Sequence, residues 1–240
     1  MTLSDITWQY ARGGFAELYK LPTRREPLTN DWAEHDGLEV DLSEPVWEPH
    51  TLSVEIHVPS YELTNLKQAL KAGIVNLPIP GYYRRYLKLR YVSSSEMAYR
   101  LGWHTMTLTF ANDDPRQLFA GLSESATPSG WDSELLTPGI IVMQSADSLN
   151  TVPGLKDPYL QESIYRSETK VPKQPYHIKA RQLAIECAAL PILGNLSELW
   201  GMLSGKDPLS LDGTKCYYKS MTDLSLTSKY LHFTLNFQEI

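Results

Sequence analysis

Two short segments, far apart in the chain, have nearly the same pattern of residues. Residues 104–110 read His-Thr-Met-Thr-Leu-Thr-Phe, and residues 232–237 read His-Phe-Thr-Leu-Asn-Phe. Large apolar residues alternate with smaller polar ones in both, which is the period of a β-strand with one buried face. Either two strands are alike by chance or the chain builds one unit twice, and a duplication restricts the possible folds strongly.

Other features repeat in the same order. The alternating segment Leu52–Val58 is matched by Leu183–Ala189, 131 positions later (183 − 52), and both contain a glutamate at the same place. Two amphipathic segments follow, 65–73 and 195–205, which lie 130 positions apart (195 − 65). The spacing of their leucines predicts helices. Each ends on a glycine, Gly73 or Gly205, suited to the left-handed position after a helix.

The match continues to the C-terminal end of each copy. Tyr82-Tyr83 and Tyr217-Tyr218 are expected to enter corresponding strands. The last strands are 127 positions apart (235 − 108), and this smaller offset predicts a longer final hairpin in the first copy, with a polar tip at 93–96. Four matches in one order favour duplication over chance.

The repeat predicts a mainly β (α+β) protein with tandem duplicated β-sandwich or barrel units, each with one inserted α-helix. The first unit is expected at 1–120, with its core at about 47–112, and the second at 121–240, with its core at about 178–240. Segment 121–130 is rich in Ser, Gly and Pro, which is the composition of a linker. A buried type of strand is expected at 138–144.

Composition limits the possible partners. The 240 residues provide enough chain for two units of about 100–120 residues. A net charge of −6 argues against specific nucleic-acid binding. In the one basic cluster, 82–91, charged and apolar residues alternate, as in a strand with one solvent-exposed face. We expect no membrane span, no signal peptide and synthesis in the cytosol. Cys187 and Cys216 are expected to be packed as reduced residues.

No pattern of residues predicts catalysis. The acidic segment Asn30–Asp41 could offer oxygen ligands to calcium but lacks the required spacing, so we favour a solvated loop that turns at Asp36-Gly37. The sequence has no nucleophile elbow, phosphate-binding loop or dinucleotide-binding motif. Gly13-Gly14 is interpreted as part of a flexible segment that precedes the first unit's core. We therefore predict no catalytic, cofactor-binding or metal residue. The histidines show no zinc-type spacing; they are His35, His50, His57, His104, His177 and His232.

The repeated strand–helix–strand unit resembles the tail-tube-type fold of bacteriophages and related contractile injection systems, and is most similar to distal tail and tail-hub proteins. The similarity lies in Leu52–Val58, the helix that ends at Gly73, and Met106–Phe110, with their second-copy counterparts. Further segments look like phage-tail proteins of bacterial prophages; they are Lys20–Trp32, Asp36–Val40, Gly130–Asp132 and Gly139–Val142.

The resemblance implies a structural protein of a virion tail, assembled in the bacterial cytoplasm, and not an enzyme. It implies self-association into a ring, either a hexamer or a trimer with pseudo-sixfold symmetry, and contacts with other tail proteins. Such rings use head-to-tail contacts, which also cover free strand edges. The polar segment Asn30–Asp41 is then a candidate arm between subunits.

Two other functions stay open. The chain's 6 tryptophans and 14 tyrosines are compatible with a β-sandwich module that binds carbohydrate or protein, with Trp103 or Trp131 as candidate contact residues. A hydrolase with paired carboxylates is the third reading, although no pattern marks a particular pair.

Overall fold

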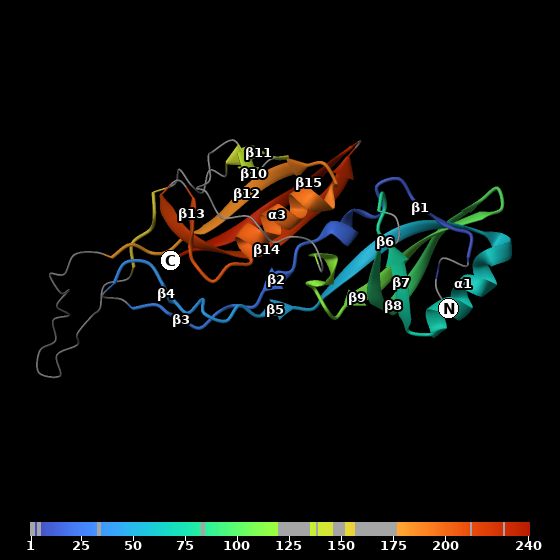
Figure 1. Ribbon diagram of the computed structural model, residues 1–240, viewed down its shortest axis with the longest axis horizontal. Helices are drawn as coiled ribbons and strands as arrows, with labels where there is room; N and C mark the ends of the chain where they lie inside the picture. The colour runs from blue at the N-terminus through green and yellow to red at the C-terminus, as the bar shows by residue number, and fades with distance from the viewer. Residues whose placement is uncertain are drawn as a thin grey trace, which may run out of the picture.

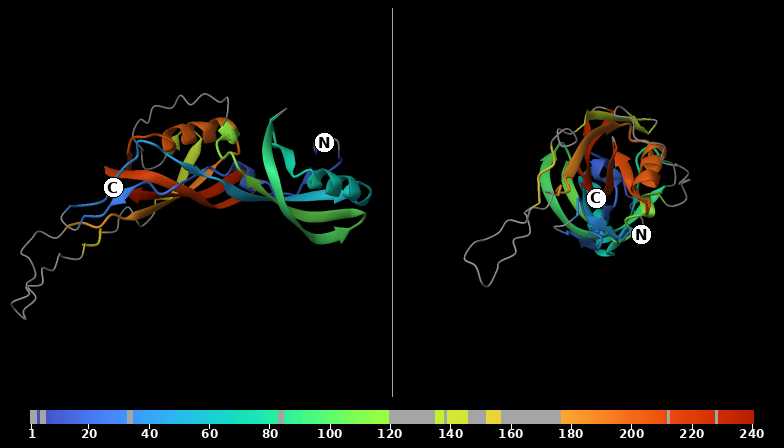
Figure 2. Two further views of the ribbon diagram at one scale, coloured as in Figure 1. Left: turned by 90° about the horizontal axis from the view of Figure 1, so that it is seen from below. Right: turned by 90° about the vertical axis from the view of Figure 1, so that its left-hand side faces the viewer.

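The computed structural model describes residues 3, 6–32, 35–82, 85–119, 135–137, 139–145, 152–156, 177–211, 213–227 and 229–240. The predicted linker at 121–130, Trp131 and the segment Gly130–Asp132 lie outside these residues. Within them the protein is mainly β, with two curled antiparallel sheets that lie end to end along the long axis of the molecule (Figures 1 and 2). The expected fold class is confirmed.

The first unit is built on a five-stranded sheet with the strand order β1-β6-β9-β8-β7. Helix α1 (Leu63–Lys71) connects β6 to β7, and its buried residues are Leu66, Ala69 and Leu70. The strands are β1 (Gln9–Tyr10), β6 (His50–Pro59), β7 (Ile74–Pro78), β8 (Tyr86–Arg100) and β9 (Trp103–Asn112). Short 3-10 helices are η2 (Ala16–Tyr19), η3 (Ser60–Glu62) and η4 (Gln117–Phe119).

The second unit is built on a six-stranded sheet with the order β10-β11-β12-β15-β14-β13. Helix α3 (Leu193–Leu203) connects β12 to β13, in the place that α1 has in the first unit. The strands are β10 (Leu135–Thr137), β11 (Ile140–Ser145), β12 (Gln182–Ala189), β13 (Leu209–Leu211), β14 (Thr214–Thr227) and β15 (Tyr230–Glu239).

Period-2 alternation produces the core, because one face of each central strand is apolar. In β6 the alternating buried row consists of Leu52, Val54, Ile56 and Val58, and in β9 it consists of Met106, Leu108 and Phe110. The corresponding rows of the second unit are Leu183, Ile185, Cys187 and Ala189 in β12, and Leu231, Phe233, Leu235 and Phe237 in β15. Both helices cover these rows with their apolar faces.

Strand pairing confirms the duplication. Leu52 pairs with Phe110 in the first unit, and Leu183 pairs with Phe237 in the second. Leu183 is the sequence counterpart of Leu52, and Phe237 is that of Phe110, so residues that correspond in the sequence also form corresponding pairs in the two sheets. The long strand of each unit has a register shift at the same place, after Tyr91 in β8 and after Tyr218 in β14. The five strands of the first sheet correspond in order, register and bulge to β11-β12-β15-β14-β13 of the second, which has β10 as an additional edge strand, so the two sheets are copies of one unit.

One part of the sequence alignment was wrong. Tyr91 pairs with Phe110 and Tyr218 pairs with Phe237, so Tyr91, and not the Tyr82-Tyr83 pair, is the counterpart of Tyr218. The predicted long final hairpin is also wrong: segment 93–96 lies within β8, whose pairing with β9 continues to Arg100 and Trp103, just as the pairing of β14 with β15 continues to Thr227 and Tyr230. The extra length of the first copy lies between β7 and β8.

The predicted helix ends differ in the two copies. Gly73 follows the last residues of α1 with a φ of +79°, as expected for a left-handed position after a helix. Gly205 occupies the corresponding place after α3 but is not among the glycines with positive φ, so that part of the prediction was wrong. Among the described residues, no helix is both long and apolar enough to cross a membrane.

The two units share one continuous core. Trp200 of α3 contacts Trp47 of β5 (Trp47–Glu48) with ring centroids 4.5 Å apart, and it stacks on Phe119 of η4 at 5.6 Å. The side chain of Tyr82 accepts a hydrogen bond from the backbone amide of Leu193, at the start of α3. Residues before and after the first sheet therefore bury the helix of the second unit.

Candidate assembly surfaces

The outer faces of the two sheets carry the same kind of polar ladder. Glu55 pairs with Thr107 in the first unit, and Glu186 pairs with Thr234 at the equivalent place in the second. Around these pairs lie small hydroxyl and amide side chains with hydrogen bonds along the sheet. His57 Nδ1 lies 2.8 Å from Thr105 Oγ1, Ser53 Oγ lies 3.5 Å from Thr109 Oγ1, and Asn236 donates to Thr222 Oγ1 at 3.0 Å.

A long arm of the first half of the chain lies against the second unit. The arm comprises residues 29–32 and 35–41, with β3 (Thr29–Asn30) and β4 (Glu39–Val40), and extends from the small ribbon of β2 (Thr23–Arg24) and β5 along the second unit (Figure 1). The backbone amide of Gly37 donates to the carbonyl of Ile178 at 2.9 Å. The sequence suggested an arm between subunits, and the structure shows that this arm contacts its own chain.

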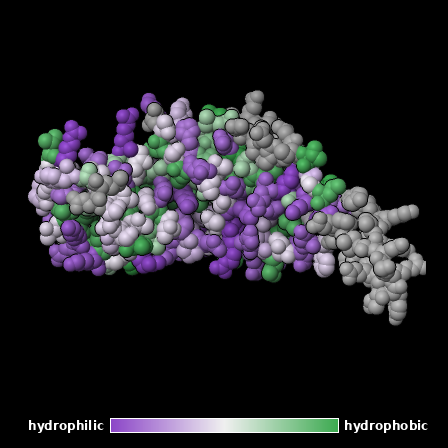
Figure 3. Space-filling model, turned by 180° about the vertical axis from the view of Figure 1, so that it is seen from behind, coloured by the Kyte–Doolittle hydropathy of each residue, from purple (hydrophilic) through white to green (hydrophobic). Residues whose placement is uncertain are grey.

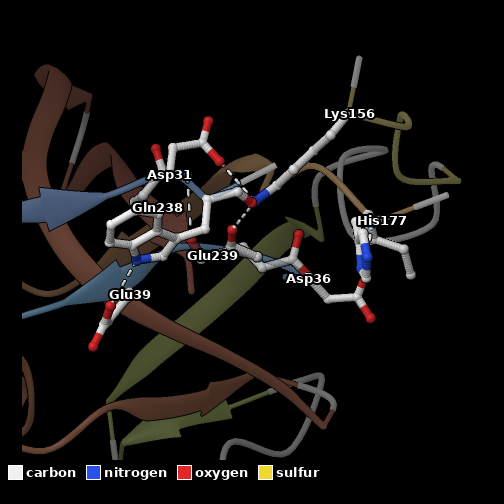
Figure 4. Close-up of polar contacts among 10 residues, drawn as sticks. Asp31, Asp36, Glu39, Lys156, His177, Gln238 and Glu239 are labelled. Atoms are coloured by element: carbon white, nitrogen blue, oxygen red, sulfur yellow. Dashed lines mark hydrogen bonds and ion pairs between the residues drawn. The ribbon is translucent and has the colours of Figure 1, made fainter. Parts of the chain in front are cut away.

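Lys156 fastens the arm (Figure 4). Its ammonium donates to the carbonyl oxygens of Trp32 at 2.8 Å and Gly37 at 2.6 Å, and it lies 2.6 Å from Asp31 Oδ1. The side chain is only 7% exposed, so all three N–H donors of a nearly buried cation are satisfied. Nothing in the local sequence links residue 156 to residues 31–37, which is why sequence reasoning missed this contact.

Asp36 forms the second fastening point of the arm. Its Oδ1 accepts hydrogen bonds from the backbone amide of Ile178 at 2.7 Å and from His177 Nδ1 at 3.2 Å (Figure 4). The Ile178 bond, and then the His177 contact, hold the pKa of the Asp36 carboxyl below its ordinary value of 3.8. The expected turn at Asp36-Gly37 is present, with Gly37 at a φ of +69°.

We expect the hold on the arm to weaken in acid. A carboxyl whose pKa is lowered by folding contributes stability above its unfolded pKa and loses it as the pH falls through the folded pKa. The Asp36 contact should therefore be complete at neutral pH and fade below about pH 3.8. The backbone amide shift of Ile178 in a titration by NMR measures this directly. Asp36→Asn should abolish that titration step; an Ile178 shift that stays constant down to about pH 2 would contradict the expectation.

Three described acidic residues of the arm, Asp31, Asp36 and Glu39, each have a protein donor. Trp32 Nε1 donates to Glu39 Oε2 at 2.9 Å, and Asp31 contacts the ammonium of Lys156. Asp36 contacts the backbone amide of Ile178 and the side chain of His177. Within the described part of the chain, no group of three or more His, Cys, Asp or Glu side chains could hold a metal ion.

Several other candidate residues are buried in the core, and two histidines lie outside it. Cys187 and Cys216 are buried and free, and burial raises the pKa of each thiol to about 12, so both stay protonated. Burial, together with nearby Lys20, lowers the pKa of His50 to about 4, which keeps its ring neutral. His232 points to the outer face of its sheet, whereas His104 lies beside Ser60 Oγ at 3.1 Å.

Two shallow grooves lie along the arm and its base. One, of about 390 Å³, is lined by Arg24, Leu28 and neighbouring residues of 41–46. Arg24 is buried between the rings of Trp47 and Tyr217, at 5.8 and 5.6 Å from their centroids, and desolvation lowers its pKa. The other groove, of about 330 Å³, is lined by half-exposed Trp32 and by polar residues of the arm.

An apolar group stands at the free end of the first unit. Tyr99, Leu101 and Trp103 belong to the β8–β9 hairpin, and Tyr61 of η3 lies beside it because Ser60 hydrogen-bonds to the carbonyl of Gly102. Figure 3 shows a largely hydrophilic back of the molecule with a small hydrophobic group at this end.

A comparison with protein-family models found no match, and searches of curated proteins and of solved structures found none either. The resemblance to phage tail proteins therefore stays a prediction.

Proposed function

We propose that this protein is a structural component of a phage or prophage tail and forms a closed ring in the distal tail or hub region. The observation that supports this most directly is the duplication itself, with the two units in head-to-tail contact. A unit that binds its own copy in this way has complementary surfaces at its two ends, and repeated head-to-tail contacts either close into a ring or extend into a filament.

The outer sheet faces support the same proposal. Both units carry a ladder of small polar side chains around one carboxylate, Glu55 in the first and Glu186 in the second. A surface of hydroxyl groups and carboxylates, on a chain with a net charge of −6, suits the wall of a channel through which DNA passes without binding. In the ring these faces line the channel.

The mass of the assembly tests this proposal. Three chains of 27.2 kDa, or about 82 kDa, provide six units for one ring, and six chains give about 163 kDa. Light scattering over a concentration series, with negative-stain images of the same sample, should show one of these masses and a ring with a central opening. A protein that stays monomeric at every concentration, with no rings in the images, would count against the proposal.

A binding module for carbohydrate is the second candidate function. Trp32 is half exposed and lines a groove of about 330 Å³ together with Asp36 and Glu39, and sugar sites combine an aromatic ring with carboxylates. Glycan-array binding by the monomer that is lost in Trp32→Ala would favour this function over the ring.

A further inference from the structure

Arg24 is a buried cation with few hydrogen-bond acceptors around it. Its side chain is only 5% exposed, and its one hydrogen bond within the described part of the chain runs from Nη2 to the carbonyl oxygen of Leu42 at 3.4 Å. Nε is buried without a partner. The rings of Trp47 and Tyr217 attract the charge but satisfy none of its N–H donors. Burying a cation in this way is costly unless a further acceptor binds it.

Two other well-packed cations of the chain do have their acceptors. Arg181 donates through Nε and Nη2 to both carboxylate oxygens of Glu239, at 2.8 and 3.1 Å. Lys156 uses all three of its donors. A guanidinium has five N–H donors in a planar fork that matches a carboxylate. Arg24 is as deeply buried as Lys156, but no carboxylate of the described residues forms an ion pair with it.

Arg24 lines the groove of about 390 Å³ at the base of the arm. The groove follows the ribbon of residues 24–28 and 41–47, whose two strands are joined by backbone hydrogen bonds. Two exposed apolar side chains also line it, Leu28 at 82% and Val46 at 47% exposure. A buried charge beside apolar walls, in a space of this size, is typical of a site for a small organic ligand.

The other charges of the groove restrict the ligand. Three carboxylates line it, those of Glu26, Asp41 and Glu44. Glu26 is bound to Lys219 at 2.9 Å, and Asp41 accepts the backbone amide of Ser43 at 3.0 Å. Together these carboxylates repel a doubly charged anion such as phosphate more strongly than a singly charged one. The groove therefore favours a ligand with one negative charge.

We propose that this groove binds a singly charged carboxylate, which accepts hydrogen bonds from Nη1 and Nη2 of Arg24 and places its apolar part against Leu28 and Val46. The site is separate from the outer sheet faces and goes beyond the proposed role in assembly. A free carboxylic acid and a carboxylate on a second copy of this chain present the same group to Arg24, and the experiment below distinguishes these two sources.

Propionate is the probe for this site, and the indole N–H signal of Trp47 in NMR spectra reports its binding. Titration of the wild type should give a saturable shift that sodium chloride at the same ionic strength does not produce. Arg24→Met should bind propionate at least about tenfold more weakly, because a buried charged donor is lost. Arg25→Met is the matched control, since Arg25 lines the same groove but is exposed and paired with Glu48; its binding should change less than about threefold.

Two comparisons keep the test independent of whether the variant folds. Propionamide has the shape of propionate without its charge, so the wild type should bind it at least about tenfold more weakly. In buffer without propionate, Arg24→Met should melt at the same or a higher temperature than the wild type, because a buried charge is replaced by an apolar side chain. Propionate should raise the melting temperature of the wild type only.

The absence of a saturable shift in the wild type, or equal binding of propionate and propionamide, would overturn the proposal. Equal binding by the wild type and a folded Arg24→Met, or tighter binding of phosphate than of propionate, would also overturn it. Sedimentation velocity identifies the source of the carboxylate. Dissociation of a wild-type oligomer by propionate, but not by propionamide, would assign the carboxylate to a second copy, and a mass that propionate leaves unchanged would assign it to a free acid.

Discussion

Replacing Trp200 with alanine is expected to lower the free energy of unfolding by about 4 kcal/mol, because a large buried ring is removed and a cavity is left behind. Trp200 is 2% exposed and contacts Trp47 and Phe119, which both come from the first half of the chain. The loss should therefore affect the two units together. Urea unfolding, followed by tryptophan fluorescence and by circular dichroism, measures both the size of the loss and whether the transitions coincide.

The control for this experiment is Trp32→Ala. Trp32 is half exposed, and its side chain makes one hydrogen bond, to Glu39, at the surface, so its removal should cost less than about 1 kcal/mol. If Trp200→Ala costs as little as Trp32→Ala, the shared core does not stabilise the protein. Two separate transitions in the wild type would show instead that the units unfold independently, despite the rings that join them.

Local pattern was sufficient to predict the repeated core. The alternation in Leu52–Val58 and Leu183–Ala189 and the helix faces around Leu66 and Leu196 all appear as expected, because period-2 and period-3.6 patterns depend on residues close in sequence. The register of the long strands could not be predicted. Each contains a bulge, after Tyr91 or Tyr218, and one extra residue shifts every later pair without a clear sequence signal.

The candidate surfaces were mostly hidden from the sequence. Leu101-Gly102 is not a typical hairpin dipeptide, so the sequence pattern favours a turn in the polar segment before it, at 93–96. The acidic arm was recognised as a polar loop, but its partners Lys156 and His177 are more than 100 positions away in the chain, and no periodicity links them. Contacts between such distant segments are set by the tertiary fold, which the local pattern does not specify.

Lys156→Met is expected to release the arm and to lower the free energy of unfolding by about 2–3 kcal/mol. The substitution keeps the length of the side chain but leaves the carbonyls of Trp32 and Gly37 and the carboxylate of Asp31 without their shared donor. Hydrogen exchange should show faster exchange at the Gly37 amide, which bonds to Ile178, while the amides of β6 and β9 keep their protection.

Lys219→Met is the matched control, because Lys219 binds a single carboxylate, that of Glu26, at 2.9 Å, and Glu26 is largely exposed. An ion pair of this kind contributes at most about 1 kcal/mol. Comparing the two variants tests whether Lys156 holds the arm because it is buried and has three acceptors, and not simply because it is charged. Equal losses in the two variants, or unchanged exchange at Gly37 in Lys156→Met, would mean that the arm is held by its backbone bonds and by Asp36 instead.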